Sequence, residues 1–202
     1  MVDTCGMVHD DTDRLDFIPN SGGTWTKNTG PLSASFQAHG KLIVCPYKDL
    51  YLPCLYKIYF FIFASGTYML LDISSTPERQ IFPGEEARII SPMFPSNYRG
   101  HEKCLIFSMN VHGQHVGTVR VLDEYGRMLY RYVGNKWQNI HLTEWLPVSV
   151  QLDPWQILFV IEATKGGVYS SHGEGDICID DISVIADTCR ENSPSRPLFF
   201  LH

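Results

Sequence analysis

Six cysteines are the residues of this 202-residue chain with the most obvious chemistry. They are Cys5, Cys45, Cys54, Cys104, Cys178 and Cys189. No Cys-x-x-Cys pair occurs among them, so the usual zinc-binding spacings are missing. An even number of cysteines indicates disulfide bonds and an oxidising compartment. The first four residues conflict with that indication, because they lack the basic start and apolar core of a signal peptide.

Aspartates gather near both ends of the chain. They are Asp10, Asp11, Asp13 and Asp16 on one side and Asp180 and Asp181 on the other. If the two ends pair as neighbours in a sandwich, these carboxylates come together, and hard oxygen ligands of this kind suit calcium. Asp11, Asp16 and Asp181 are therefore the candidate calcium ligands. The alternative is a set of hydrogen-bonded turns with solvated acids.

The histidines form no recognisable catalytic or metal motif. His101 and Glu102 begin like a zinc-protease motif, but Leu105 stands where the second histidine is required. A structural or solvent-exposed role is the preferred interpretation of the histidines. The sequence also has no Gly-x-Ser-x-Gly elbow and no glycine loop for a phosphate. It therefore predicts a protein that is not an enzyme.

Charge and hydropathy exclude two further classes of partner. The formal net charge is −6, whereas a nucleic-acid surface needs clustered lysine and arginine. No basic stripe is present for anionic lipid. The longest apolar run, Leu55 to Ala64, is about half the length of a spanning helix and contains Lys57. We expect no nucleic-acid partner and no insertion of this chain into a membrane.

The elements that must position these residues are short strands. Apolar residues alternate with polar ones in the runs Leu105 to Val111, Val119 to Val121 and Leu146 to Leu152. The run Ile157 to Ile161 is continuously apolar, as in a strand covered on both faces. Glycines and an Asp-Pro pair punctuate the runs, and no window has a sustained helical period. The pattern predicts an all-β sandwich or jelly roll.

One strand pattern changes phase. Ile177 and Ile179 share one parity, while Ile182 and Val184 share the other. A β-bulge at Asp180 and Asp181 lets both pairs face the core. The alternative is a strand covered on both faces.

The aromatic residues have two interpretations. Trp145 and Trp155 flank predicted strands, and we expect them to fill the core or its rim. Tyr125, Tyr130 and Tyr132 are either interface anchors or packing residues, because tyrosine is enriched in recognition patches. Core or rim packing is the preferred interpretation for each of them.

Two segments do not fit a regular strand pattern. Phe36 to Ala64 has two cysteines, two prolines and many aromatic residues, with no polar face. Arg190 to His202 contains two prolines and has the composition of a linker or a truncated end. We therefore expect one domain over residues 1–189, with an atypical insert at 36–64, and a tail at 190–202.

Six motifs in order along the chain resemble a MAM domain, the module of meprins, neuropilins and mu-type receptor tyrosine phosphatases. The motifs are CGMVHDDTDRLDF (5–17), GTYMLLD (66–72), ARIISP (87–92), CLIFSMNVHG (104–113), GTVRVLDEYG (117–126) and GEGDICIDDISVI (173–185), followed by Cys189. Each motif alone is weak, but their number and order are specific. The resemblance covers about Cys5 to Cys189 except for the insert.

The resemblance implies a fold and a function. The fold is an antiparallel β-sandwich of jelly-roll type. The function is extracellular protein–protein recognition or adhesion by a non-catalytic module of a cell-surface or secreted protein, with a protein partner that includes a second copy as one option. The alternative is an accessory assembly module of a secreted, meprin-like metalloprotease. Calcium is the only cofactor to consider, since some members of the family bind cations.

The resemblance also implies a disulfide between Cys104 and Cys189, with Cys5 bonded to a cysteine upstream that this chain lacks. In this chain Cys5 is then either unpaired or bonded to Cys45 or Cys54. Cys178 stands where the family has a small apolar residue, so a buried free thiol is the preferred interpretation.

The departures from the family pattern also carry information. Phe17 replaces the usual tryptophan, and the insert adds about thirty residues before the GTYMLLD motif. We interpret the insert as either a lineage-specific loop or a translated intron, and the chain as an incomplete copy of its parent protein. A third interpretation is a defective gene product that never folds and aggregates through Leu55 to Ala64 and an unpaired Cys5.

Overall fold

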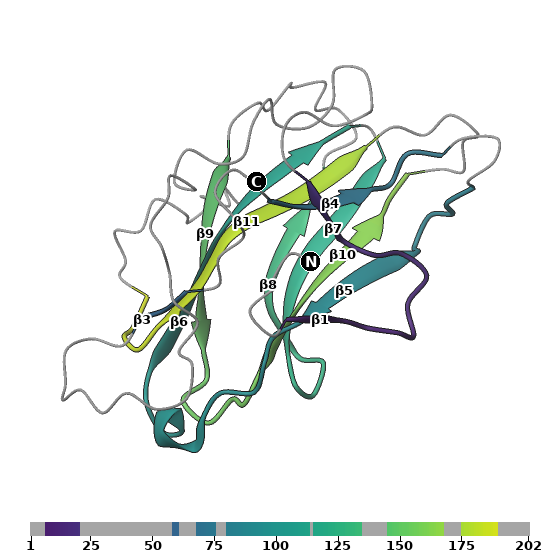
Figure 1. The fold of residues 1–202 in the computed structure, drawn as a ribbon. Coiled ribbons are helices and arrows are strands. Elements are labelled where there is room, and N and C mark those ends of the chain that lie inside the picture. The colour runs from purple at the N-terminus through teal and green to yellow at the C-terminus, as the bar shows by residue number, and fades with distance from the viewer. Residues whose placement is uncertain are drawn as a thin grey trace, which may run out of the picture.

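The computed structural model describes residues 7–20, 58–60, 68–75, 80–113, 115–134, 145–167 and 175–189. These ranges contain β-strands and one 3-10 helix, η2 (Ser96–Tyr98), and no α-helix (Figure 1). Within them, no helix has both the length and the apolar character needed to cross a membrane.

The strands form two antiparallel sheets. The five-stranded sheet has the order β1 (Val8–His9), β5 (Glu86–Ile90), β10 (Phe159–Lys165), β7 (Val116–Asp123) and β8 (Met128–Val133). The second sheet has the order β2 (Ile18–Asn20), β4 (Tyr68–Asp72), β11 (Asp176–Ile185), β6 (Lys103–His112) and β9 (Leu146–Leu152), and β3 (Ile58–Phe60) also pairs with β11. The predicted fold class, an antiparallel β-sandwich of jelly-roll type, is confirmed.

The hydrophobic core lies between the two sheets and follows from the alternation in the sequence. In β6, Leu105, Phe107, Met109 and Val111 are all buried in it, as the pattern predicts. The five-stranded sheet contributes the inward residues of β7 and β10, such as Val121 and Ile161. Each fully buried side chain of this size contributes about 1.5–3 kcal/mol, so this alternation is the main source of stability.

The predicted bulge in β11 is present. The pairing of β11 with β6 shifts register between Asp180 and Ser183, and Asp181 has a left-handed φ of 53°. As a result, the isoleucines before the shift and the residues Ile182 and Val184 after it all enter the core. By contrast, the strand expected to begin at Ile157 begins only at Phe159, because residues 156–158 belong to the preceding loop.

Part of the atypical insert belongs to the second sheet. β4 pairs with residues 176–179 of β11, and β3 pairs with residues 183–185 beyond the bulge. The other residues of the insert, together with Cys5 and the tail 190–202, lie outside the described residues. The domain boundaries therefore stay a prediction.

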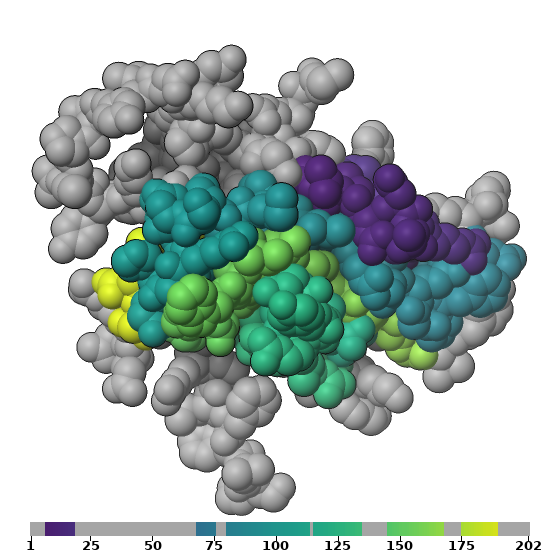
Figure 2. All heavy atoms as spheres, turned by 90° about the horizontal axis from the view of Figure 1, so that it is seen from below, coloured from purple at the N-terminus to yellow at the C-terminus, as the bar shows by residue number. Residues whose placement is uncertain are grey.

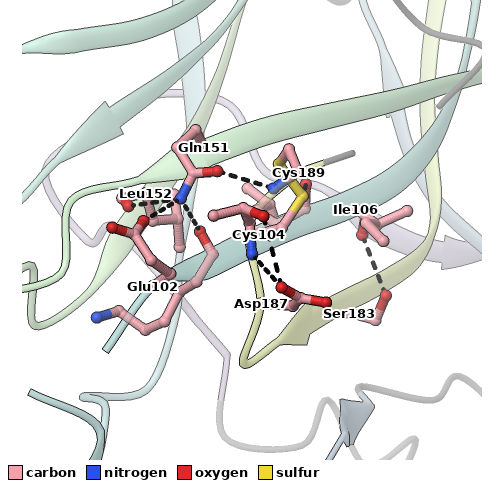
Figure 3. Close-up of a disulfide and its surroundings, with 11 residues drawn as sticks. Glu102, Cys104, Ile106, Gln151, Leu152, Ser183, Asp187 and Cys189 are labelled. Carbon is pink, nitrogen blue, oxygen red and sulfur yellow. Dashed lines mark hydrogen bonds between the residues drawn. A yellow bond between two sulfur atoms is a disulfide. The ribbon is translucent and has the colours of Figure 1, made fainter. Parts of the chain in front are cut away.

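A disulfide joins Cys104, on β6, to Cys189, just after β11 (Figure 3). The two Cα atoms are 5.1 Å apart. Gln151 of β9 supports the link, because its Oε1 accepts a hydrogen bond from the backbone N–H of Cys189 at 2.8 Å. This is the pairing that the family resemblance implies. Among the described cysteines, Cys178 is a buried free thiol.

We expect the double substitution Cys104→Ala and Cys189→Ala to lower the free energy of unfolding by up to about 4–5 kcal/mol, because the link restrains a long loop of the unfolded chain. The two cysteines are 85 residues apart. Urea denaturation measures the change. Cys178→Ala is the control, since it removes a thiol without removing a cross-link. A double variant as stable as the Cys178→Ala variant would contradict the prediction.

Candidate interaction surface

Three large apolar side chains stand out by their exposure. Met93, Tyr125 and Trp155 are 71%, 79% and 70% exposed, more than any other exposed large hydrophobic residue in the described ranges. They lie on three loops, 91–102, 124–127 and 153–158, which connect the strands at one end of the sandwich (Figure 1). Figure 2 views the molecule from below and shows these loops next to one another. We call the three loops with these side chains the end surface.

A buried lysine ties two of the loops together. Lys103, the first residue of β6, is only 1% exposed. Its Nζ donates hydrogen bonds to the carbonyl oxygens of Tyr98 at 3.3 Å and His101 at 3.1 Å in one loop. It also donates to the carbonyl oxygen of Pro154 at 2.6 Å in the other loop. A buried ammonium needs such partners, and these three acceptors hold both loops around one atom.

The surroundings of Lys103 affect its ionisation. Burial lowers its pKa, and the negative charges of Asp153, Glu102 and Glu124 only partly oppose this. The ring of Phe94 lies 5.6 Å from Nζ, at a distance suited to a cation–π contact. Glu124 belongs to the 124–127 turn. Because its charge acts on Lys103, this turn lies near the other two loops.

Further contacts fix Trp155. The backbone N–H of Gly100 donates to the carbonyl of Pro154 at 2.9 Å, and Asp153 Oδ1 accepts from the N–H of Trp155 at 2.8 Å. The indole ring lies over Gly100, within 3.5 Å of the point that a Cβ would occupy. Gly100 has a φ of 79°, which favours glycine at this position. The indole is therefore both exposed and held on a fixed backbone.

Asp123 organises the turn that carries Tyr125. Its Oδ1 accepts from the backbone N–H groups of Tyr125 at 2.9 Å and Arg127 at 2.8 Å. Its Oδ2 accepts from Arg127 Nε at 2.5 Å. Burial by itself raises the pKa of Asp123, but these hydrogen bonds outweigh burial and hold the pKa below its ordinary value.

The predictions for the aromatic residues thus have different outcomes. The expectation that Trp155 fills the core or its rim is wrong, because the two loops carry the indole out of the sandwich. Trp145 does pack, edge to face, against Tyr68 at 5.7 Å between ring centroids. Tyr130 and Tyr132 pack against the core. Among the three tyrosines, only Tyr125 is exposed as an interface anchor would be.

The candidate calcium ligands lie apart in the architecture. Asp11 is exposed in a turn, and the carboxylate of Asp16 is exposed 3.4 Å from His9 Nδ1. Asp181 is on β11, where its Oδ2 accepts from Ser108 Oγ at 3.4 Å. The strands next to the two groups of aspartates are not neighbours, because β1 belongs to the five-stranded sheet and β4 lies between β2 and β11. No three His, Cys, Asp or Glu side chains in the described ranges form a group that could hold a metal.

The other N-terminal acids accept hydrogen bonds within turns, which is the alternative to calcium binding. Asp10 Oδ1 accepts from the N–H of Thr12 at 3.0 Å, and Asp13 Oδ2 accepts from the N–H of Arg88 at 2.6 Å. These are hydrogen-bonded turn and strand contacts. Calcium binding by Asp11, Asp16 and Asp181 stays a prediction.

The calcium prediction can be tested by melting. If the folded chain binds calcium, millimolar calcium raises the melting temperature relative to EGTA, because a ligand of the folded state stabilises it by mass action. Asp16→Asn is expected to remove that difference. Equal melting temperatures in calcium and EGTA would rule calcium out as a stabilising ligand.

The hydrogen bonds of Asp123 predict a pH-dependent stability. Because its folded pKa is lowered, its contribution is present above its unfolded pKa of about 3.9 and is lost as the pH falls through the folded value. At neutral pH we expect Asp123→Asn to destabilise the protein by about 1–3 kcal/mol. The difference from the wild type should shrink toward pH 2 in acid-dependent urea titrations.

The matched control for Asp123→Asn is Asp11→Asn, which removes an exposed carboxylate. It should leave the neutral-pH stability within about 0.5 kcal/mol of the wild type. A constant difference between wild type and Asp123→Asn at all pH values would contradict the role given to the charge.

Comparison with known proteins identifies a family model and several relatives that are similar to this chain. The model of the family described as "MAM domain, meprin/A5/mu" matches residues 62–190. MAM domain-containing glycosylphosphatidylinositol anchor protein 1 of Gallus gallus is 31% identical over 145 residues, which are 63% of this chain and 14% of that protein. The corresponding anchor protein 2 of Mus musculus is 29% identical over 216 residues, or 95% of this chain and 18% of that protein. Neuropilin-1 of Rattus norvegicus is 32% identical over 108 residues, or 50% of this chain and 11% of that protein.

The chain thus spans less than a fifth of the length of these relatives. Among solved structures, the K1 cleaved adhesin domain of Lys-gingipain from Porphyromonas gingivalis W83 is similar with a TM-score of 0.50 at 10% identity. That likeness covers 93% of this chain and 98% of the adhesin domain, and it concerns the fold alone. The family model, in contrast, matches more than half of the chain, and the chain therefore belongs to the MAM domain family.

Proposed function

We propose that this chain is a non-catalytic module for protein–protein recognition outside the cell, and that its end surface contacts the partner. Membership of the MAM family supports a recognition module. The disulfide supports an oxidising compartment. The names of two relatives, which are glycosylphosphatidylinositol anchor proteins, support a place at the cell surface.

The single observation that carries the proposal is the gathering of the three most exposed large apolar side chains on adjacent loops. Exposed apolar residues are ordinary when they are scattered, but a group of them at one place marks a binding site. Tyrosine and tryptophan are also enriched among the residues that dominate binding energy in protein interfaces. Tyr125 and Trp155 are therefore the expected anchors, with Met93 as an adaptable contact.

The rigidity of the loops adds to this argument. Asp123 fixes the turn beneath Tyr125, and Lys103 fixes the two loops that carry Met93 and Trp155. Loops that are ordered before binding lose less conformational entropy when the partner arrives. The end surface thus presents its aromatic rings in fixed positions.

Charges of both signs surround these rings. Arg99 and Arg127 are exposed, as are Glu102 and Asp153. Because the charges are mixed, long-range attraction of a strongly charged partner is weak. We expect recognition to depend on apolar and aromatic contact and only modestly on salt.

The proposal predicts which substitutions weaken binding to the partner. A fluorescent tetramer of the disulfide-intact chain is expected to bind cultured vertebrate cells saturably, and trypsin treatment of the cells should remove the binding. Trp155→Ala and Tyr125→Ala should each weaken binding by about tenfold or more, as truncation of an anchor residue does. Flow cytometry measures the binding, and the melting temperature of each variant checks its fold.

The control is Phe82→Ala, which truncates an exposed large apolar residue that is 42% exposed and lies before β5, away from the end surface. It should bind as the wild type does. Equal binding by the wild type, both anchor variants and the control would show that recognition uses another surface.

A further inference from the structure

The edge strands of the two sheets differ in how open they are to pairing with a further strand. β1, β2 and β3 are only two or three residues long, β2 contains Pro19, and β9 contains Pro147. Short strands and prolines keep a sheet edge from pairing with other chains. The part of β5 beyond β1 is occupied, because Asp10 and Asp13 bond the backbone of Arg88. β8 has six residues and no proline, and in the described part of the chain it pairs with β7 alone (Figure 1).

The pairing with β7 determines which backbone groups of β8 face away from the sheet. Just after β8, the N–H of Gly134 donates to the carbonyl oxygen of Gly117 at 2.7 Å. Hydrogen-bonded and non-hydrogen-bonded pairs alternate along an antiparallel ladder. The register therefore puts Val133 and Arg131 in non-hydrogen-bonded pairs with β7, so their N–H and C=O groups point away from that strand. We call this side of β8 the open edge.

A row of charges on the outer face of the sheet ends at the open edge with an unbalanced arginine. Glu162 of β10, 1% exposed, accepts hydrogen bonds from Arg88 Nε at 2.9 Å and Arg120 Nε at 2.6 Å. Glu86 also contacts Arg88, at 2.6 Å. Arg131 of β8 lies directly opposite Arg120, but no described carboxylate forms an ion pair with it. Like charges directly opposite each other are unfavourable, so a carboxylate next to Arg131 would stabilise this end of the row.

Apolar side chains lie on both sides of Arg131 along the outer face of β8. Met128 and Val133 are 56% and 54% exposed. They share the outer face with Arg131, because the register shift near Met128 offsets the three-residue spacing and the alternate residues Tyr130 and Tyr132 pack against the core. A strand laid along the open edge would therefore meet an apolar residue, an arginine and a second apolar residue in turn.

We propose that the open edge of β8 binds an extended segment of a different protein, which adds a sixth strand to this sheet and places a single carboxylate opposite Arg131. In strand addition, main-chain hydrogen bonds supply affinity and alternate side chains supply specificity. The outward N–H and C=O groups of Arg131 and Val133 provide the main-chain bonds. The exposed side chains of Met128, Arg131 and Val133 select an apolar, an acidic and an apolar residue at alternate positions of the segment.

Charge also decides between the possible occupants of this edge. Antiparallel pairing of two β8 strands centred on Arg131 would bring two guanidinium groups directly opposite each other, which disfavours a second copy of the chain. The formal net charge of −6 repels a strongly acidic partner at a distance. The segment that fits is therefore a nearly neutral strand with one acid at its centre, whose attraction to Arg131 acts at short range.

Fluorescence anisotropy of a labelled peptide, Ser-Val-Thr-Glu-Thr-Val-Ser, tests the proposal with the disulfide-intact full chain at up to about 0.5 mM. We expect saturable binding. The peptide with lysine in place of glutamate should bind about tenfold or more weakly, because it puts a like charge opposite Arg131. A peptide N-methylated at alternate amides, with either phase of the alternation, should lose binding in the phase that blocks the main-chain bonds.

Two substitutions locate the site on β8. Arg131→Glu should raise the dissociation constant of the glutamate peptide about tenfold or more and reverse the preference toward the lysine peptide. Val133→Pro should also raise it about tenfold or more. It should keep the wild-type melting temperature, because an edge strand tolerates proline where the missing N–H faces away from the sheet.

Arg99→Glu is the matched control, because it reverses an exposed arginine of the end surface. It should bind the glutamate peptide as the wild type does. Absence of saturable binding, equal binding of the glutamate and lysine peptides, full binding by both N-methylated peptides, or an equal loss with Arg99→Glu would each overturn the proposal. So would dimers of the chain alone that Val133→Pro abolishes, since they would assign the edge to a second copy. The inference does not rest on the proposed function, because Trp155→Ala should weaken cell binding and leave peptide binding unchanged.

Discussion

The bulge at Asp180 and Asp181 is the constraint on which the architecture of this domain depends. β11 is the central strand of the second sheet and pairs with β4, β6 and β3. Without the register shift, Ile182 and Val184 would turn to the outer face and half of the strand would contribute nothing to the core. The same shift separates the part of β11 that pairs with β4 from the part that pairs with β3. One extra residue therefore sets which segments can join the sheet and delivers the chain to Cys189, opposite Cys104.

Features that depend on local pattern could be read from the sequence, and features that depend on how loops meet could not. The alternation in β6 and β9 and the phase change in β11 are properties of neighbouring residues, so they predicted the strands and the bulge. The Asp-x-x-Gly pattern at Asp123 is also a local turn signal.

Lys103 carries no such signal, because its three acceptors come from residues that only the fold brings together. Trp155 was misjudged for the same reason: its exposure follows from the contact between two loops that are far apart in sequence. The N-terminal aspartates were expected to meet Asp180 and Asp181 because the strands beside them were taken as neighbours, but β4 lies between β2 and β11.

Charged side chains have different roles on two surfaces of the molecule. At the end surface, a buried ammonium and a buried carboxylate organise irregular backbone, and the exposed rings are left free to touch other molecules. On the outer face of the five-stranded sheet, regular pairing already fixes the backbone, and the arginines and glutamates are used to neutralise one another. In both places the buried charge is fully hydrogen-bonded, as burial of an ion requires. Fixed aromatic rings suit a specific contact.

The disulfide also determines how the domain responds to tension. A pull applied to the chain beyond Cys189 passes through the sulfur–sulfur bond directly to Cys104, at the start of β6. The 85-residue separation between the two cysteines is closed covalently, so β7 to β11 cannot be extended by such a pull even if their hydrogen bonds break. The load falls instead on the strands that precede Cys104. A module built in this way can lengthen only through its N-terminal part, while the loops that carry Tyr125 and Trp155 stay inside the covalently closed portion.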